Sequence, residues 1–392
     1  MRPSTRNAAV SAALVLGLVA GPLALPATAA TAPAAPIPIS VAGSVAAPPD
    51  RHPGPDTDAL RAALVGLPDA EATAALIRVG GKGSWHGHAG VRDLRSQKPA
   101  LAHARFRAGS VTKVVTAALV LQLAAEGRVD LEAPVERYLP GLLPASFTEP
   151  VTVRHLLTYT SGLQPGRSFG NTVEEEYPHR FETLTPEEVV ASAVAKGPLF
   201  TAGERQRYGN IDYTVLGMLI EEVTGERYER WADRKIFKPL GLRHTSFPKG
   251  PDPRLHGPHN RGYQLMGGEL VDVTEWNMSD RWAAGDLIST TADLERFMVA
   301  LFRGRVVPEP QLKEMFTVPP GIEGATRSAG LQVFTLHGKE VWGKTGARPG
   351  YATVIAATRD LSRTLVYSVN STDAKGDGSR TALRFGFPAF LR

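Results

Sequence analysis

The hydrophobic periodicity of this chain changes twice along its length, and this change limits the fold more than any other feature. Ala74–Val79 and Ser84–Val91 have the short apolar patterns of strands and are separated by a glycine-rich turn. Residues 110–127 instead form a long apolar stretch that predicts a helix, and residues 131 to about 240 have short apolar stretches with helix start and stop signals, cut by Pro, Gly and Thr-rich turns. Strand patterns return near the C-terminus, at residues 330–336, 339–342, 352–358 and 364–369. We therefore expect an α+β fold: one antiparallel β-sheet built from both chain ends, flanked by helices, with an inserted helical lobe.

Composition excludes several classes of protein. Of the 392 residues, 43% are hydrophobic and 21% are charged, which is typical of a folded globular chain and not of a disordered one. The net charge of +5 comes without a run of basic residues, so we expect no nucleic-acid partner. The chain has no cysteine, which excludes disulfide bonds, thiolate metal sites and a cysteine nucleophile.

The first 30 residues have the pattern of a secretory signal peptide. Arg2 and Arg6 precede the apolar stretch Val10–Leu25, and Ala27–Ala30 supplies small residues for cleavage. A membrane anchor is the alternative, but this stretch has about 16 residues where a spanning helix needs about 20. We predict a secreted mature protein with no membrane anchor. Residues 31–57 are rich in Pro and Ala and predict a linker, and residues 58–392 predict one catalytic domain.

The sequence pattern S-x-x-K occurs twice. Ser110–Lys113 opens an apolar helix, so its serine and lysine would lie one turn apart on the same helix face. Ser246–Lys249 contains Pro248 and is followed by Gly and Pro, which prevents a helix there. We therefore interpret Ser110 as the candidate nucleophile and the second copy as chance.

Lys113 would lie among valines, where loss of water lowers the pKa of an amine from about 10.4. A lysine with such a pKa could carry a proton near neutral pH. The alternative is a surface lysine that follows a helix-capping serine, and the tetrapeptide alone does not exclude it.

Two further motifs follow in order along the chain. Tyr208 and Asn210 form its only Y-x-N: a phenol near Ser110, held partly as phenolate, could act as a general base, and the amide could bind substrate. A buried structural tyrosine is the alternative. The only K-T-G is formed by Lys344, Thr345 and Gly346, on a predicted edge strand.

The K-T-G strand predicts a substrate-binding site. Lys344 would attract an anionic group, Thr345 would offer a hydroxyl, and Gly346 would let the substrate backbone approach closely. The N–H groups of Ala347 and Ser110 would form an oxyanion hole, in which one donor contributes about 3 kcal/mol. Together, the three motifs are the arrangement of penicillin-interacting serine enzymes.

From about Asp58 onward the chain resembles the serine β-lactamase-related superfamily, above all secreted streptomycete-type D-alanyl-D-alanine carboxypeptidases and class C β-lactamases. The segments that carry the resemblance are Phe106–Lys113, Tyr138–Pro144, His155–Leu163, Ala283–Gly285, Ile288–Leu294, Gly343–Gly346 and Gly350–Tyr351.

The resemblance implies that Ser110 is acylated, that Lys113 and Tyr208 exchange protons, and that Asn210 and the K-T-G strand bind substrate. It implies a D-alanyl-D-alanine carboxypeptidase that acts on peptidoglycan peptides, as a monomer and with neither metal nor cofactor. A β-lactamase or a small-ester hydrolase of the same fold is the first alternative, and a non-catalytic peptidoglycan-binding module is a more remote one. Tyr208 and Lys113 are both candidates for activating the deacylating water.

The chain departs from these carboxypeptidases where the peptide's terminal carboxylate should bind. They carry His in place of Lys344 and Thr in place of Ala347. Their arginines on the preceding strand are missing here, since that strand includes Phe334. Arg348 is a candidate replacement whose side-chain direction the sequence leaves open.

Overall fold

The computed structural model describes residues 54–336 and 338–391. The predicted signal peptide and most of the predicted linker lie outside these residues. In the part of the chain that the structure describes, no helix has the length and hydropathy needed to cross a membrane.

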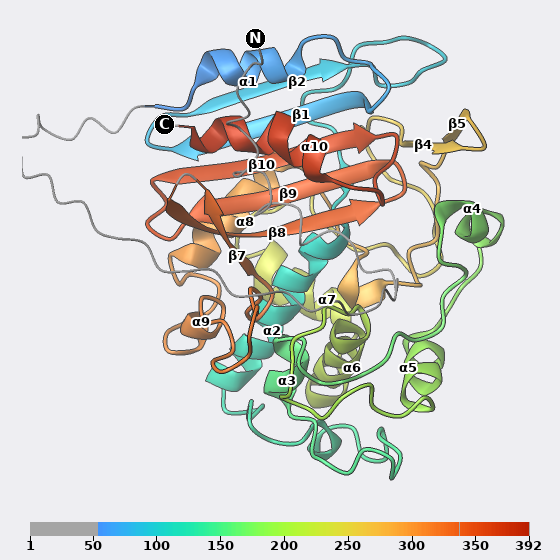
Figure 1. Cartoon of the computed structure of the whole chain (residues 1–392), viewed down its shortest axis with the longest axis vertical. Helices are drawn as coiled ribbons and strands as arrows, with labels where there is room; N and C mark the ends of the chain where they lie inside the picture. The colour runs from blue at the N-terminus through green and yellow to red at the C-terminus, as the bar shows by residue number, and fades with distance from the viewer. Residues whose placement is uncertain (1–53, 337, 392) are drawn as a thin grey trace, which may run out of the picture.

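A six-stranded antiparallel sheet forms the upper part of the molecule (Figure 1). Strand β1 from the N-terminal end pairs along its length with β10 from the C-terminal end, so both chain ends build one sheet, as predicted. The α+β fold is confirmed. In spatial order the strands are β2 (Trp85–Gly90), β1 (Ala72–Gly81), β10 (Arg363–Ser371), β9 (Tyr351–Thr358), β8 (Lys339–Arg348) and β7 (Gln332–Leu336).

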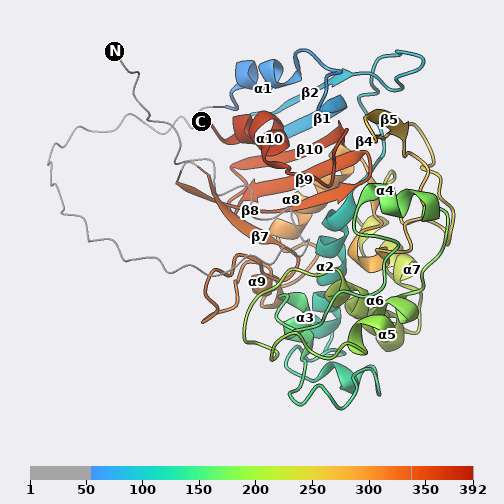
Figure 2. The same cartoon turned by 45° about the vertical axis from the view of Figure 1, so that its right-hand side comes forward.

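One face of the sheet is covered by the two ends of the described chain. Helix α1 (Thr57–Leu64) lies beside α10 (Ser379–Thr381) and the helical turns that continue it to Phe390 (Figure 2). Leu60 and Phe385 are buried between these helices and the sheet. The N-cap of α1 is Asp56, whose carboxylate accepts a hydrogen bond from Ala59 N at 3.1 Å. Helix α1 therefore starts one residue before the predicted domain boundary.

The other face of the sheet packs on α8 (Thr291–Phe302) and α2 (Thr112–Ala125). Helix α2 is apolar on nearly its whole surface and lies between the sheet and the helical lobe, which is where such a helix is stable. It therefore places its N-terminal end between the two halves of the molecule.

The helical lobe lies below the sheet in Figure 1. There are also two small ribbons of two strands each: one joins β3, which precedes α2, to β6, and the other joins β4 to β5. Gly225 ends α6 in a left-handed conformation, as its position predicts. The remaining elements are α3 (Val153–Leu157), α4 (Val173–Glu176), α5 (Pro186–Val194), α6 (Ile211–Thr224), α7 (Tyr228–Ala232), α9 (Gln311–Glu314), β3 (Phe106–Arg107) with β6 (Ile288–Ser289), and β4 (Tyr263–Met266) with β5 (Glu269–Asp272).

Strand β8 is an edge strand over only half its length, which corrects the prediction. It pairs with β9 from Val341 to Arg348, whereas β7 pairs with it only from Lys339 to Gly343. The edge is open only beyond Gly343, because β7 begins opposite that residue. The K-T-G residues occupy this open half.

Candidate active site

The backbone around Ser110 is held by the segments on either side of it. Gly109 has a φ of +53°, which favours glycine, and it begins a short 3₁₀ turn that leads into α2. The Thr112 hydroxyl donates to Gly109 O at 2.7 Å and accepts from Leu287 N at 3.0 Å. Ser110 therefore lies at the start of a buried helix, as predicted, with its backbone fixed.

Lys113 is fully buried one turn further along. Its Nζ lies 3.2 Å from Ser110 Oγ and 2.7 Å from two oxygens, Asn210 Oδ1 and the main-chain O of Ala284. Burial, and then the positive charge of Lys344, hold the pKa of Lys113 well below its usual 10.5. The predicted low pKa is confirmed, and the surface-lysine alternative is wrong.

The Tyr208 ring is surrounded by cations. The charged groups of Lys113, Lys344 and Arg327 lie 5.1, 5.0 and 5.2 Å from its centroid. Burial raises the pKa of Tyr208 to about 12, although nearby Ser110 acts in the opposite direction. Its hydroxyl is buried without a hydrogen bond of normal geometry. The phenol is therefore neutral, contrary to the expected partial phenolate, because the lost hydration outweighs the attraction of the cations.

Asn210 lies at the N-cap of α6, and its amide oxygen accepts from Lys113. This oxygen therefore positions the lysine, and only the amide N–H₂ group is left to bind a substrate carbonyl. The structure thus places Asn210 beside Lys113, as predicted. Its amide oxygen, however, is used to hold the lysine and is not available to a substrate.

The open half of β8 lies against the serine loop. A Cβ on Gly346 would lie 2.0 Å from Ala108 O and 3.0 Å from Ser110 N. A Cβ on Gly109 would lie 2.6 Å from Ala347 N. Gly346 is thus needed for contact with the protein's own backbone. The result is that the main chain of Ala347 faces the loop that carries Ser110.

The two remaining K-T-G side chains differ in exposure. Lys344 is 4% exposed and donates to Thr345 O at 2.7 Å. Its burial, and then the charge of Arg327, lower the pKa of Lys344 to about 7. Thr345 is half-buried, as is Ala347 two positions further along the strand. All eight predicted site residues are thus gathered around the N-terminus of α2.

Arg327 was missed by sequence reasoning. It precedes β7, and Gln206 holds its backbone: Nε2 of Gln206 donates to Arg327 O at 2.8 Å, and Arg327 N donates to Oε1 at 3.1 Å. These bonds join Arg327 to the loop that carries Tyr208. No motif surrounds Arg327, so only the tertiary structure shows its place.

Arg348 does not reach the site. It is 2% exposed and forms a buried ion pair with Asp280 at 2.9 Å. Phe334 is packed on the opposite side of the sheet, with Leu60 and Phe385. Arg348 is therefore no candidate for binding a substrate carboxylate, and Phe334 does not replace an arginine of the site.

Sequence reasoning also missed two groups that act on Lys113 through their charge. Arg281 lowers the pKa of Lys113 and is ion-paired with Glu176. Asp212 accepts a hydrogen bond from Ser161, and burial raises the pKa of this carboxyl to about 7. Neither Arg281 nor Asp212 belongs to the S-x-x-K, Y-x-N or K-T-G motif.

Known proteins with this arrangement were found by three comparisons. The model of the family described as Beta-lactamase matches residues 60–385. The Bacillus subtilis (strain 168) protein PbpX, named as a penicillin-binding protein, is 29% identical over 63% of this chain, and the match spans 57% of its own length. Penicillin-binding protein 4* of the same organism is 26% identical over 76% of this chain and 68% of its own.

Among solved structures, a D-stereospecific amidohydrolase from Streptomyces sp. superposes with a TM-score of 0.73. It is 33% identical, and the match covers 85% of this chain and 99% of that one. With the family match over most of the described residues, and with Ser110, Lys113 and Tyr208 in one place, the chain belongs to the β-lactamase family, as a hydrolase of the serine β-lactamase and penicillin-binding protein fold.

Proposed function

We propose that the protein hydrolyses the amide bond after a D-residue through an acyl-enzyme on Ser110, as a D-alanyl-D-alanine carboxypeptidase. The observation that carries this proposal is the dehydrated amine of Lys113, 3.2 Å from Ser110 Oγ. A hydroxyl is a weak nucleophile until a nearby base removes its proton.

The hydrogen bonds of Lys113 support its role as the base. A neutral amine has two N–H bonds and one lone pair. Asn210 Oδ1 and Ala284 O, both at 2.7 Å, take the two N–H bonds. The lone pair is then left for the Ser110 hydroxyl. Lys113 thus takes the proton as Oγ attacks the substrate carbonyl carbon.

The negative oxygen that forms in this attack is stabilised by main-chain donors. The N–H groups of Ser110 and Ala347 are the two candidates, because the close approach at Gly346 and Gly109 brings β8 against the serine loop. Each donor of this kind contributes about 3 kcal/mol.

Tyr208 supports the second half of acylation. A phenol with a pKa of about 12 holds its proton at neutral pH and can pass it on. When the tetrahedral intermediate breaks its C–N bond, the proton that Lys113 took reaches the leaving amine through Tyr208. Water then attacks the acyl-enzyme, with Lys113 neutral again and available as its base.

Arg327 and Lys344 are suited to bind the terminal carboxylate of a peptide. They lie 5.2 and 5.0 Å from the Tyr208 ring, and the charge of Arg327 acts on Lys344. An anion placed between them would relieve this repulsion. They thus provide the cations that the strand before K-T-G lacks.

A second candidate is the hydrolysis of D-amino acid amides. It is favoured by the 33% identical Streptomyces neighbour, which is named a D-stereospecific amidohydrolase. It also agrees with a Lys344 pKa of about 7, since a lysine that is half neutral binds an uncharged amide at little cost. A β-lactam or a small ester would use the same acyl-transfer groups.

Labelling tests the nucleophile. Wild-type protein should react with a fluorescent penicillin and with a fluorophosphonate, and Ser110→Ala should react with neither. Ser246→Ala, in the other S-x-x-K copy, is the matched control and should label normally. Labelling of Ser110→Ala would remove Ser110 as nucleophile, and no labelling of wild type would favour a binding module.

Product assays separate the substrate classes. Release of D-alanine from a D-Ala-D-Ala peptide is compared with hydrolysis of D-phenylalaninamide, nitrocefin and p-nitrophenyl acetate. In Arg327→Gln, KM for the peptide should rise about 10- to 100-fold, because a charge-assisted contact contributes about 1.5–3 kcal/mol. KM for the amide should not change, and Arg305→Gln, an exposed position, is the control. Equal effects on both substrates would contradict carboxylate binding by Arg327.

We also propose that the protein is exported, cleaved near residue 30, and acts as a monomer on peptides of the cell wall. This rests on the sequence of the first 30 residues. N-terminal sequencing of protein from the culture medium should find a start near Thr31, and light scattering should give the mass of one chain. An uncleaved N-terminus would contradict the proposal.

A further inference from the structure

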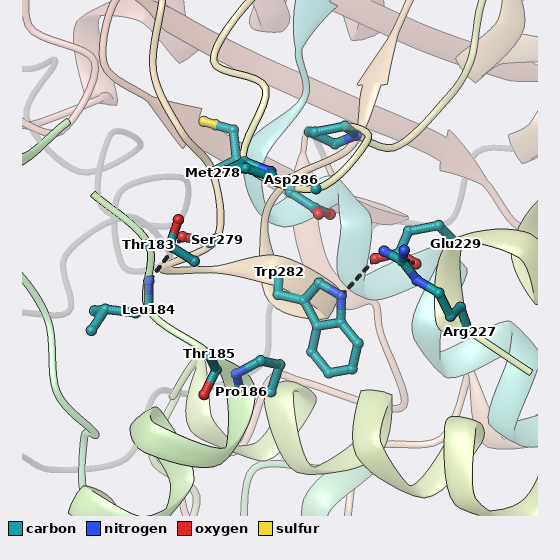
Figure 3. Close-up of a pocket in the computed structure, with 13 residues that line it drawn as sticks. Thr183, Leu184, Thr185, Pro186, Arg227, Glu229, Met278, Ser279, Trp282 and Asp286 are labelled. Atoms are coloured by element: carbon teal, nitrogen blue, oxygen red, sulfur yellow. Dashed lines mark hydrogen bonds and ion pairs between the residues drawn. The ribbon is translucent and has the colours of Figure 1, made fainter. Parts of the chain in front are cut away.

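A cavity of about 180 Å³ lies outside the catalytic groups, and we call it the Asp286 pocket. It is formed by the start of α5, residues 227–229 of α7 and its cap, the loop 248–251, and the loop 278–286 (Figure 3). Neither Ser110 nor Lys113 lines it. It is therefore a second concave site, next to the loop whose Ala284 O holds Lys113.

Asp286 is the unusual residue of this pocket. Its side chain is 5% exposed, and Oδ1 is buried without a hydrogen-bond partner. Figure 3 shows its carboxyl group directed toward the indole of Trp282 and toward Glu229. A buried carboxyl oxygen without a partner is destabilising, so a ligand that supplies a donor would recover free energy.

Glu229, in contrast, has a hydrogen bond on one oxygen and an ion-pair partner beside the other, although Oε2 makes no hydrogen bond. Oε1 accepts from Trp282 Nε1 at 2.9 Å, and Oε2 lies 3.3 Å from Nη2 of Arg227. The pocket thus holds two carboxyl groups and one guanidinium. When Asp286 is ionised these three groups carry one net negative charge, which one cationic ligand beside Asp286 would balance.

The walls of the pocket indicate the chemical nature of the rest of such a cationic ligand. Leu184, Pro186, Pro251, Met278 and the Trp282 ring are apolar. A cavity of about 150 Å³ holds a molecule the size of benzene. The described residues contain no cluster of three His, Asp, Glu or Cys side chains that would hold a metal ion. The carboxyl groups and apolar walls of the pocket therefore favour an organic ligand.

We propose that the Asp286 pocket binds a small organic cation, a primary ammonium on a short apolar or aromatic body, with its ammonium on the Asp286 carboxylate and its body against Trp282. The ring face of Trp282 adds a favourable interaction with the positive charge. Pocket and ligand do not depend on the reaction at Ser110, so the proposal stands or fails independently of the proposed function.

Calorimetry with benzylamine tests the proposal. The titrations use Ser110→Ala protein, so that turnover does not contribute heat. Benzylamine should bind with one site per chain, and benzyl alcohol, which has the same shape without the charge, should not bind. In Asp286→Asn on the same background, Kd should rise at least tenfold. Glu187→Gln, an exposed carboxylate in the first turn of α5, is the matched control and should keep Kd unchanged.

A pH series tests the same site without altering it. The groups that face Asp286 are Glu229 and Tyr228 on α7, Arg348 on β8, Arg107 on β3, and Asp280 on its own loop. Burial, and then Glu229, hold the pKa of Asp286 well above its usual value. The ammonium binds the ionised carboxylate, so it competes with a proton for Asp286. Kd should therefore fall as pH rises and rise as pH falls.

Three results would overturn the proposal: equal binding to Asp286→Asn, equal binding of benzyl alcohol, or no binding of benzylamine to a folded protein. If Asp286→Asn does not fold, the pH series decides alone. A Kd that is independent of pH, without proton release in buffers of different ionisation enthalpy, would contradict a ligand on Asp286.

Discussion

At the scale of single residues, the proposed mechanism depends on the buried lysine Lys113, which is shielded from water. Lys113 keeps its place through bonds to an amide oxygen and a main-chain oxygen, each at 2.7 Å. The fold supplies the free energy that this burial costs, through the apolar packing of α2. The pKa of Lys113 is thereby held well below the usual value for lysine, which favours the neutral amine that the proposed mechanism requires.

Lys113→Met should remove the base and keep most of the volume. The rate of fluorophosphonate labelling should fall by about 10²–10⁴-fold, which is the usual contribution of a positioned base. Circular dichroism and the denaturant midpoint report whether the fold persists. A folded variant that labels at the wild-type rate would assign the base to Tyr208.

The charge of Lys344 gives a pH dependence whose direction is fixed. Its pKa of about 7 means that the ammonium loses its proton as pH rises through neutrality. KM for a substrate with a free carboxylate should therefore rise above pH 7, and KM for D-phenylalaninamide should stay level. Parallel pH profiles for the two substrates check this, and an equal rise in both would show that Lys344 does not bind the carboxylate.

At the scale of elements, the site exists because a helix start and half a strand lie in contact. Helix α2 brings Ser110 and Lys113, and the half of β8 that β7 leaves open brings the main chain of Ala347. Only glycine at 346 allows this approach, since a side chain there would meet Ala108 O. The proposed oxyanion hole thus depends on the packing of two elements.

Gly346→Ala should separate β8 from the serine loop. We expect a loss of at least about tenfold in kcat, with less change in KM, because the donors act on the transition state. Lys339→Ala, at the exposed far end of the same strand, is the control and should leave kcat unchanged. An unchanged kcat in Gly346→Ala would show that the loop can move at no cost to catalysis.

At the scale of the whole molecule, both chain ends close the sheet on which the site rests. Strand β1 pairs with β10, and α1 packs with the C-terminal helix over the outer face. The site lies on the other side, between the sheet and the helical lobe. The smaller, outer-face core is therefore separated from the candidate site by the sheet, while the larger core lies on the same side as the site.

Phe385→Ala should test this separation. The side chain is 1% exposed, and truncation of a buried Phe costs about 3–5 kcal/mol of unfolding free energy. We expect a lower denaturant midpoint and, below the transition, an unchanged KM. Leu383→Ala changes a side chain that is 39% exposed nearby and should cost much less. A large change in KM in Phe385→Ala would mean that the two faces are coupled.

Those parts of the fold and of the candidate site that depend on local interactions could be predicted from the sequence. Ser110 and Lys113 are one helical turn apart, so their contact follows from spacing alone, and strand alternation placed the sheet at both ends. The errors arose where neighbours come from distant segments. The ionisation of Tyr208 was expected in the wrong direction, and Arg348 was a candidate that proved to be buried in an ion pair with Asp280.

The order of motifs and the periodicity of the chain predicted its family, its α+β fold and its candidate nucleophile, because each of these signals is carried by residues that are neighbours in the sequence. Tertiary structure alone decided which groups are charged, since a pKa depends on how much water distant segments exclude. It also brought Arg327 beside Tyr208 and left the Asp286 carboxyl buried without a partner, because only packing determines which polar atoms find one another.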